Sequence, residues 1–192
     1  MNKMIEPTSL VSKIAIYMVI AAGTLLIPFL AMRFTEEVEW GIGDFALAWI
    51  LIFGTLLTFN LISREMKGTY KAAVGVAVTT ALFLVWMNLG VGLIGSEDNP
   101  INLAFGGVLL LGVIGAFVSR LEPSGMAKTL AVMALAHAFI ALYAMITGSG
   151  EPVNGVQEIL TINGVFVALW VGSAWLFQKA IPEQPSERVG SV

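Results

Sequence analysis

Six long apolar stretches alternate with short polar segments along the chain. They cover about residues 14–32, 43–63, 72–95, 102–119, 128–147 and 159–178. Each is close to the roughly 20 residues that a helix needs to cross a ~30 Å hydrocarbon core. None shows the period-two alternation of transmembrane strands. The pattern therefore predicts an all-α fold, a bundle of six transmembrane helices over residues 14–178, with polar segments at 1–13 and 179–192.

The composition agrees with a lipid environment. Of the 192 residues, 57% are hydrophobic and only 12% are charged, whereas about a quarter of the residues of a soluble domain are charged. The mean hydropathy is +0.87. So little charge cannot cover a globule in water, so we expect an integral membrane protein. The chain has no cysteine, which excludes disulfides, thiolate metal sites and thiol catalysis.

The first apolar stretch has two interpretations. Lys3 and Lys13 precede it, as in a signal peptide. Its apolar run is longer than that of a signal peptide, and no A-x-A-like cleavage site follows before Arg33. We favour a retained helix, which Pro28 should kink.

The cations predict the orientation. In a six-span arrangement, the N-terminus, two of the loops and the C-terminus share one side of the membrane. That side holds nine of the ten cations: Lys3, Lys13, Arg64, Lys67, Lys71, Arg120, Lys128, Lys179 and Arg188. The opposite side holds only Arg33. Positive-inside bias therefore predicts that both termini are cytoplasmic.

The opposite, outer side is acidic. Its carboxylates are Glu36, Glu37, Glu39, Asp44, Glu97, Asp98, Glu151 and Glu158. Asp and Glu contribute little to orientation, but this separation of charge would be scrambled if one span were miscounted.

A repeat of about 57 residues is visible. Lys13, Lys71 and Lys128 each stand at the start of an odd-numbered span. One interpretation is three tandem helical hairpins with parallel orientation. The other is that any regular six-helix protein with short loops produces such a period.

The segment GSEDNP at 95–100 interrupts two apolar runs. Gly95 suits a left-handed residue at a helix end, and Asn99 before Pro100 suits an N-cap. Alternatively, the oxygens of Ser96, Glu97, Asp98 and Asn99 could bind a divalent cation. The spacing of an EF-hand loop is lacking, which favours the turn.

Few polar residues fall within the spans. They include His137, the only histidine, together with Asn88 and Asn163, while Asp44 and Glu158 begin spans two and six. His137 would be either a proton relay or substrate contact, or a neutral hydrogen-bonding group between helices.

The sequence indicates no catalytic or cofactor chemistry. One histidine is too few for bis-histidine haem or for a multi-histidine metal site. There is no G-x-S-x-G motif, no nucleotide-binding loop and no basic nucleic-acid patch. We therefore predict no enzyme, no cofactor or metal, and no nucleic-acid partner.

Small residues recur at four-residue spacing in two spans. Gly164, Ala168 and Gly172 lie on one helix face, as do Gly112 and Ala116. Such faces allow helices to approach closely. They predict either packing within the bundle or contact in a homo-oligomer.

Residues 70–178, and G-S-E-D-N-P with the following glycines above all, resemble a group of small bacterial polytopic inner-membrane proteins. The resemblance implies a bacterial inner-membrane location. That group has no assigned activity, so no site residue is carried over from it.

Two functions remain in view. The first is an accessory or scaffold protein, with the bilayer and a second copy or another membrane protein as partners. The second is a small permease or channel for protons, cations or a small solute. Its acidic outer vestibule and polar path would comprise Asp44, Asn88, Glu97, Asp98, Glu158, Asn163 and His137. A membrane enzyme is the weakest interpretation.

Overall fold

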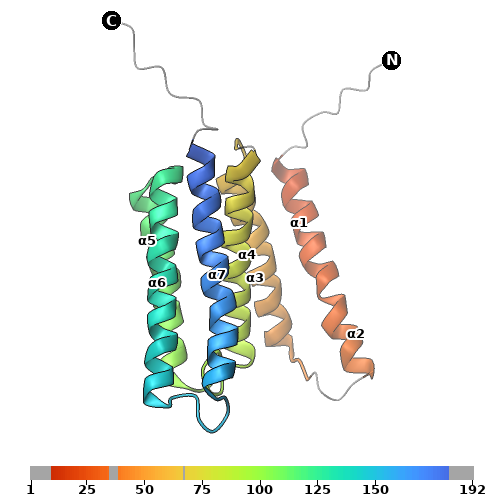
Figure 1. The fold of residues 1–192 in the computed structure, drawn as a ribbon. Coiled ribbons are helices and arrows are strands. Elements are labelled where there is room, and N and C mark those ends of the chain that lie inside the picture. The colour runs from red at the N-terminus through yellow and green to blue at the C-terminus, as the bar shows by residue number, and fades with distance from the viewer. Residues whose placement is uncertain (1–9, 35–38, 67, 182–192) are drawn as a thin grey trace, which may run out of the picture. The chain divides into compact units, whose positions relative to one another are not determined.

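A computed structural model describes residues 10–34, 39–66 and 68–181. Within these ranges the chain is helical and contains no strand (Figure 1). The elements are α1 (Leu10–Thr24), α2 (Leu26–Phe34), α3 (Ile42–Ser63), α4 (Gly68–Gly90), the 3-10 helix η1 (Pro100–Leu103), α5 (Ala104–Val118), α6 (Pro123–Thr147) and α7 (Val156–Ala180). Lys3, Glu36, Glu37, Lys67, Arg188 and most of the two predicted terminal segments lie outside the described residues.

Six helical stretches are long and apolar enough to cross a membrane. They are Val11–Phe34, Ile42–Ser63, Gly68–Gly90, Pro100–Val118, Pro123–Thr147 and Val156–Ala180. The predicted all-α fold with six candidate spans is thereby confirmed.

The third span ends earlier than predicted, at Gly90 rather than near residue 95. The backbone N–H groups of Val91 and Gly92 both donate to the Met87 carbonyl at 3.0 Å, which closes the helix. Gly92 has a φ of +73°, and a Cβ there would lie 2.5 Å from the Ser96 carbonyl oxygen. Gly92 is therefore the left-handed residue that follows the helix. Gly95, to which the sequence assigned that role, has its positive φ of 70° within the following loop.

The first span is broken where Pro28 predicts a kink. Proline has no N–H to donate to the carbonyl four residues earlier, which belongs to Thr24. The helix ends at Thr24 and resumes at Leu26. Around the break, the Leu25 N–H donates to Ala21 O at 3.4 Å and the Phe29 N–H donates to Leu25 O at 3.2 Å.

The chain divides into two compact units. Unit 1 lies within Met1–Leu61 and comprises α1, α2 and most of α3. Unit 2 lies within Ile62–Val192 and comprises α4 to α7. In unit 2, α4 packs along α7, α7 along α6, and α6 along α5, whereas α4 and α5 contact each other little. The hairpin α6–α7 is therefore closely packed, and the hairpin α4–α5 is not.

Small residues allow α5 and α6 to approach. A Cβ on Gly115 would lie 2.2 Å from Thr129 Cγ2, and one on Gly112 would lie 2.9 Å from Met133 Sδ. This small-residue face of α5 therefore packs within unit 2. On α7, by contrast, Gly164 and Ala168 are exposed, and a Cβ at Gly164 or Gly172 would meet nothing within 4 Å.

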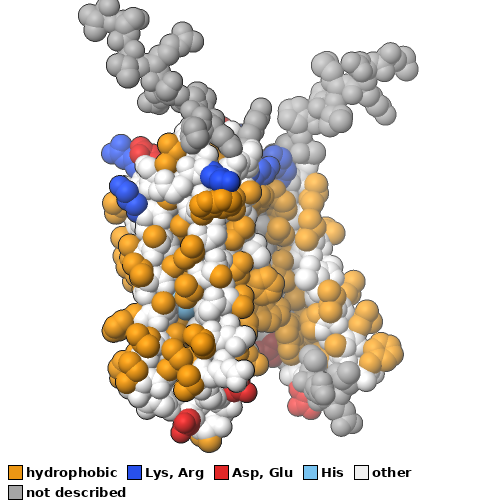
Figure 2. All heavy atoms as spheres, in the orientation of Figure 1, with side chains coloured by type: hydrophobic (Ala, Val, Ile, Leu, Met, Phe, Trp, Pro, Cys, Tyr) orange, Lys and Arg blue, Asp and Glu red, His pale blue; other side chains and the backbone are white. Residues whose placement is uncertain are grey.

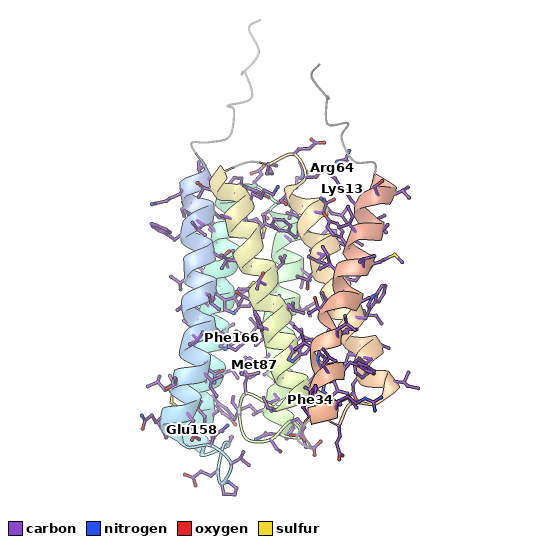
Figure 3. The ribbon with its side chains drawn as sticks, turned by 90° about the vertical axis from the view of Figure 1, so that its right-hand side faces the viewer. Lys13, Phe34, Arg64, Met87, Glu158 and Phe166 are labelled. Carbon is purple, nitrogen blue, oxygen red and sulfur yellow. The ribbon has the colours of Figure 1, made fainter. Side chains whose placement is uncertain are left out.

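Charge is separated along unit 2. Over the part of Figure 2 that unit 2 forms, Lys and Arg side chains gather at one end and most acidic side chains at the other. Figure 3 shows the same separation for Arg64 and Glu158. Two acids, Glu65 and Glu122, belong by position to the cationic end. Apolar side chains exposed between the two ends, such as Leu135 and Phe139, suit contact with lipid.

Candidate functional site

A buried polar contact in unit 2 joins α6 to α7. His137 Nε2 lies 3.1 Å from the side-chain oxygen of Asn163. An amide oxygen can only accept, so Nε2 carries the proton and donates it. Asn163 Nδ2 in turn donates to the Ile159 carbonyl at 2.9 Å. His137 and Asn163 are 0% and 1% exposed, so the pair is sealed from the molecular surface.

Two aromatic rings enclose the imidazole. The ring of Phe105 lies 4.8 Å from that of His137, centroid to centroid, and the ring of Phe166 lies 5.5 Å away and nearly parallel. Phe105, from α5, and Phe166, from α7 (labelled in Figure 3), are both buried. Three helices therefore hold the histidine, which lies between two apolar rings and is bonded to Asn163.

Two buried side-chain nitrogens of unit 2 have no hydrogen-bond partner among the described residues. They are Nδ1 of His137 and Nε1 of Trp170. A buried polar atom without a partner typically costs about 1–3 kcal/mol. The neighbouring Ser173 is satisfied, because its hydroxyl donates to the Ala73 carbonyl at 2.8 Å and ties α7 to α4.

Two segments at the acidic end, residues 91–103 and 148–155, form what we call the outer ledge, after the side of the membrane that the sequence predicts for them. Within the first loop, the Asn102 side chain accepts from the Ile94 N–H and donates to the Ile94 carbonyl, both at 3.1 Å. It also donates to Ser96 O at 2.8 Å, and Asn88 donates to Asn102 O at 2.9 Å. The buried amide of Asn102 thus organises the turn after α4.

The two loops of the ledge are joined through asparagine side chains. The Gly95 N–H donates to Asn154 Oδ1 at 2.9 Å, and Asn99 Nδ2 donates to the Ser149 carbonyl at 2.6 Å. Asn99 Oδ1 also accepts from the Ile101 N–H at 3.2 Å. The predicted N-cap at Asn99 is therefore present, at the start of η1.

These contacts favour the turn interpretation of GSEDNP over the cation site. Asn99 holds the turn, and Glu97 and Asp98 are exposed. Among the residues that the structure describes, no group of three or more His, Cys, Asp or Glu side chains is placed to hold a metal ion.

Asp44 and Glu158 serve the starts of their own helices. Each is the third residue of its helix, α3 or α7. Asp44 Oδ2 accepts from the Gly41 N–H at 2.8 Å, and Glu158 Oε2 accepts from the Gly155 N–H at 3.1 Å. A carboxylate that reaches back in this way satisfies a donor that the helix leaves open.

The residues of the predicted vestibule therefore lie at several separate places in the structure. His137 and Asn163 form the buried pair, and Glu97 and Asp98 belong to the outer ledge. Asn88 lies near the end of α4 and donates to Asn102 of the ledge. Glu158 lies at the start of α7, and Asp44 lies in unit 1. Sequence reasoning missed Asn102, Asn154 and Ser173. Their only sequence signal is a polar residue beside a turn or within an apolar helix.

The opposite end of unit 2 holds a turn with an unusual backbone. Arg120 and Leu121 have positive φ angles of 51° and 62°, which side chains with a Cβ rarely adopt. The hydroxyl of Tyr70 on α4 donates to the Leu121 carbonyl at 2.7 Å and so fixes this turn between α5 and α6.

Comparison with protein-family models, curated proteins and solved structures found no match for this chain. The resemblance of residues 70–178 to small bacterial inner-membrane proteins therefore stays a prediction.

Proposed function

We propose that this chain is a non-enzymatic accessory or scaffold protein of the bacterial cytoplasmic membrane, with both termini in the cytoplasm. The six long apolar helices favour a location within the bilayer, where lipid surrounds them. The cationic end of unit 2 supports the orientation, because Lys and Arg concentrate on the cytoplasmic side of membrane proteins.

The burial of the His137–Asn163 pair is the observation that favours a scaffold over a permease. A proton relay or substrate contact needs access to water or solute, at least in one state. His137 is instead enclosed by Phe105 and Phe166 and bonded to Asn163. Hydrogen bonds between membrane helices fix their packing, and that role accounts for the pair.

Two surfaces of unit 2 suit a partner. The face of α7 with Gly164 and Ala168 is exposed, and small residues at that spacing favour close helix contact. The outer ledge is held by asparagine bonds that join its two loops. A pre-ordered surface loses less entropy when a partner binds.

Gly164→Leu tests the α7 face. If α7 contacts a second copy or another membrane protein, the bulky side chain should abolish that complex in chemical crosslinking of native membranes. Gly106→Leu is the matched control, because Gly106 is also an exposed helical glycine at which an added Cβ would meet nothing within 4 Å. Equal crosslinking of both variants and the parent would remove α7 from the proposal.

Ion flux tests the choice of function directly. In proteoliposomes, the purified chain should move H⁺ and Na⁺ no faster than protein-free vesicles do. A flux that the parent supports and His137→Ala abolishes would establish the permease instead. The exposed acids of the ledge favour that alternative, since acid-lined openings attract cations.

The orientation is testable because the chain has no native cysteine. A membrane-impermeant thiol reagent should label Asp98→Cys on intact cells. It should label Ser124→Cys only after the cells are permeabilised. The reverse result would invert the proposed topology.

A further inference from the structure

Unit 1 contains an open cavity where α2 ends and α3 begins. Its volume is about 490 Å³, and its lining includes Phe29, Met32, Arg33, Trp40, Gly41 and Phe45. Small-molecule sites usually measure about 300–1,000 Å³, and they combine an apolar lining with a few polar groups. The cavity therefore has the size and the character of a ligand site.

Aromatic rings form its apolar wall. The ring of Phe45 stands edge-to-face against Phe29, at 6.4 Å between centroids, and against Trp40, at 5.3 Å. These contacts join α3 to α2 and to the segment before α3. Tryptophan is typical of the boundary between headgroups and acyl chains. The wall therefore suits an amphiphile at the membrane surface.

Arg33 supplies positive charge to the cavity. Its guanidinium carbon lies 5.7 Å from the centre of the Phe29 ring. This contact with the ring does not use the guanidinium N–H groups as hydrogen-bond donors to oxygen. A guanidinium can bind a phosphate through two such N–H groups. Arg33 is also the only cation among the outer segments of the sequence.

Negative charge lies at the edge of the same cavity. The Asp44 carboxylate is bonded to the N–H of Gly41, a lining residue. A carboxylate accepts several hydrogen bonds, so this bond leaves Asp44 capacity for another donor. Glu39, next to Trp40, is exposed. A purely anionic ligand would meet two like charges here, and a purely cationic one would meet Arg33.

From this arrangement we infer that the cavity binds the headgroup of a zwitterionic phospholipid. Arg33 binds the phosphate, Asp44 faces the ammonium group, and Phe29 and Phe45 contact the start of an acyl chain. The site lies wholly in unit 1, so it does not depend on the function proposed from unit 2.

Native mass spectrometry of the full-length protein in detergent tests the inference. The probes are phosphatidylethanolamine and phosphatidylglycerol with identical acyl chains. The parent should bind its first phosphatidylethanolamine more tightly than phosphatidylglycerol. Arg33→Gln should weaken that binding about tenfold, the loss expected for a charge-assisted contact.

Lys13→Gln is the matched control, because Lys13 and Phe34 lie at opposite ends of the α1–α2 segment (Figure 3) and the cavity is at the Phe34 end. This variant should bind as the parent does. Asp44→Asn keeps an oxygen that can accept the Gly41 N–H, and it should shift the preference toward phosphatidylglycerol. Equal binding by Arg33→Gln and Lys13→Gln would overturn the site. A parent that prefers phosphatidylglycerol would overturn the zwitterionic assignment.

Discussion

Unit 2 packs on itself, whereas unit 1 exposes most of its surface. In the most apolar 18 residues of each span, 33% are buried in α6 and 28% in α7, against 6% and 11% in the two spans of unit 1. The polar groups differ accordingly. Unit 2 places His137, Asn163 and Ser173 in its interior, whereas Arg33 and Asp44 of unit 1 lie at helix ends.

The difference shows what packing allows in a membrane protein. Without water to hydrogen-bond them, deep polar groups need partners from neighbouring helices. Where helices pack closely, as α6 and α7 do, those partners exist. Where helices face lipid, polar side chains are tolerable only near the ends, where they can meet headgroups. Substitutions should therefore destabilise unit 2 more than unit 1.

The largest contrast is expected for two helical glycines. Gly115→Ala should lower the free energy of unfolding by about 1–3 kcal/mol, because the added methyl collides with Thr129. Gly54→Ala in α3 meets nothing within 4 Å and should be neutral or stabilising by up to about 1 kcal/mol. Unfolding in mixed detergent–SDS micelles measures the free-energy change for both variants. Equal losses would contradict the predicted difference between the two units.

The buried pair should show coupling. Asn163→Leu leaves the His137 N–H without a partner and should cost about 1–3 kcal/mol. His137→Phe together with Asn163→Leu removes both polar groups, so the double variant should lose less than the sum of the single losses. A double-mutant cycle in the same unfolding assay checks this. Strict additivity would mean that the two side chains do not interact.

A smaller effect is expected in the outer ledge. Asn154→Ala removes the acceptor of the Gly95 N–H and should cost about 1 kcal/mol. Hydrogen exchange of the Gly95 amide should accelerate, while exchange of core amides on α6 stays slow. Glu151→Ala, an exposed site in the same loop, is the control. Its exchange profile should match that of the parent.

The smallest effect concerns the two carboxylates that cap α3 and α7. Asp44→Ala and Glu158→Ala should each cost about 0.5–1 kcal/mol, as other exposed helix caps do. Because both bonds are local and exposed, the losses should be similar in the two units. Thermal unfolding of the two variants measures this, and a much larger loss for either would indicate a role beyond capping.

The sequence predicted the spans because membrane thickness dictates the length of an apolar helix. It predicted the Asn99 cap and the break near Pro28 because these depend on neighbouring residues. The end of α4 was placed wrong because Leu93 and Ile94 are apolar yet buried within a loop. Hydropathy cannot separate such residues from a continuing helix.

The site was harder to predict because it depends on contacts between distant segments. Asn99 meets Ser149 and Gly95 meets Asn154 across 50 and 59 residues. Neither pairing has a local signature. Asp44 and Glu158 were assigned to the vestibule only because they lie at the acidic ends of their spans. In the structure, each carboxylate instead accepts a hydrogen bond from a backbone N–H three residues earlier.

Whether unit 2 is sealed around His137 can be measured by the accessibility of cysteines placed deep in α6. Ala134 and Ala141 are 4% and 6% exposed, and they lie about one helical turn to either side of His137 on α6. In a chain without native cysteine, Ala134→Cys and Ala141→Cys should resist a small water-soluble thiol reagent that readily modifies Asp98→Cys. Modification of either buried site as fast as position 98 would show that water reaches the interior and that unit 2 is not sealed around His137.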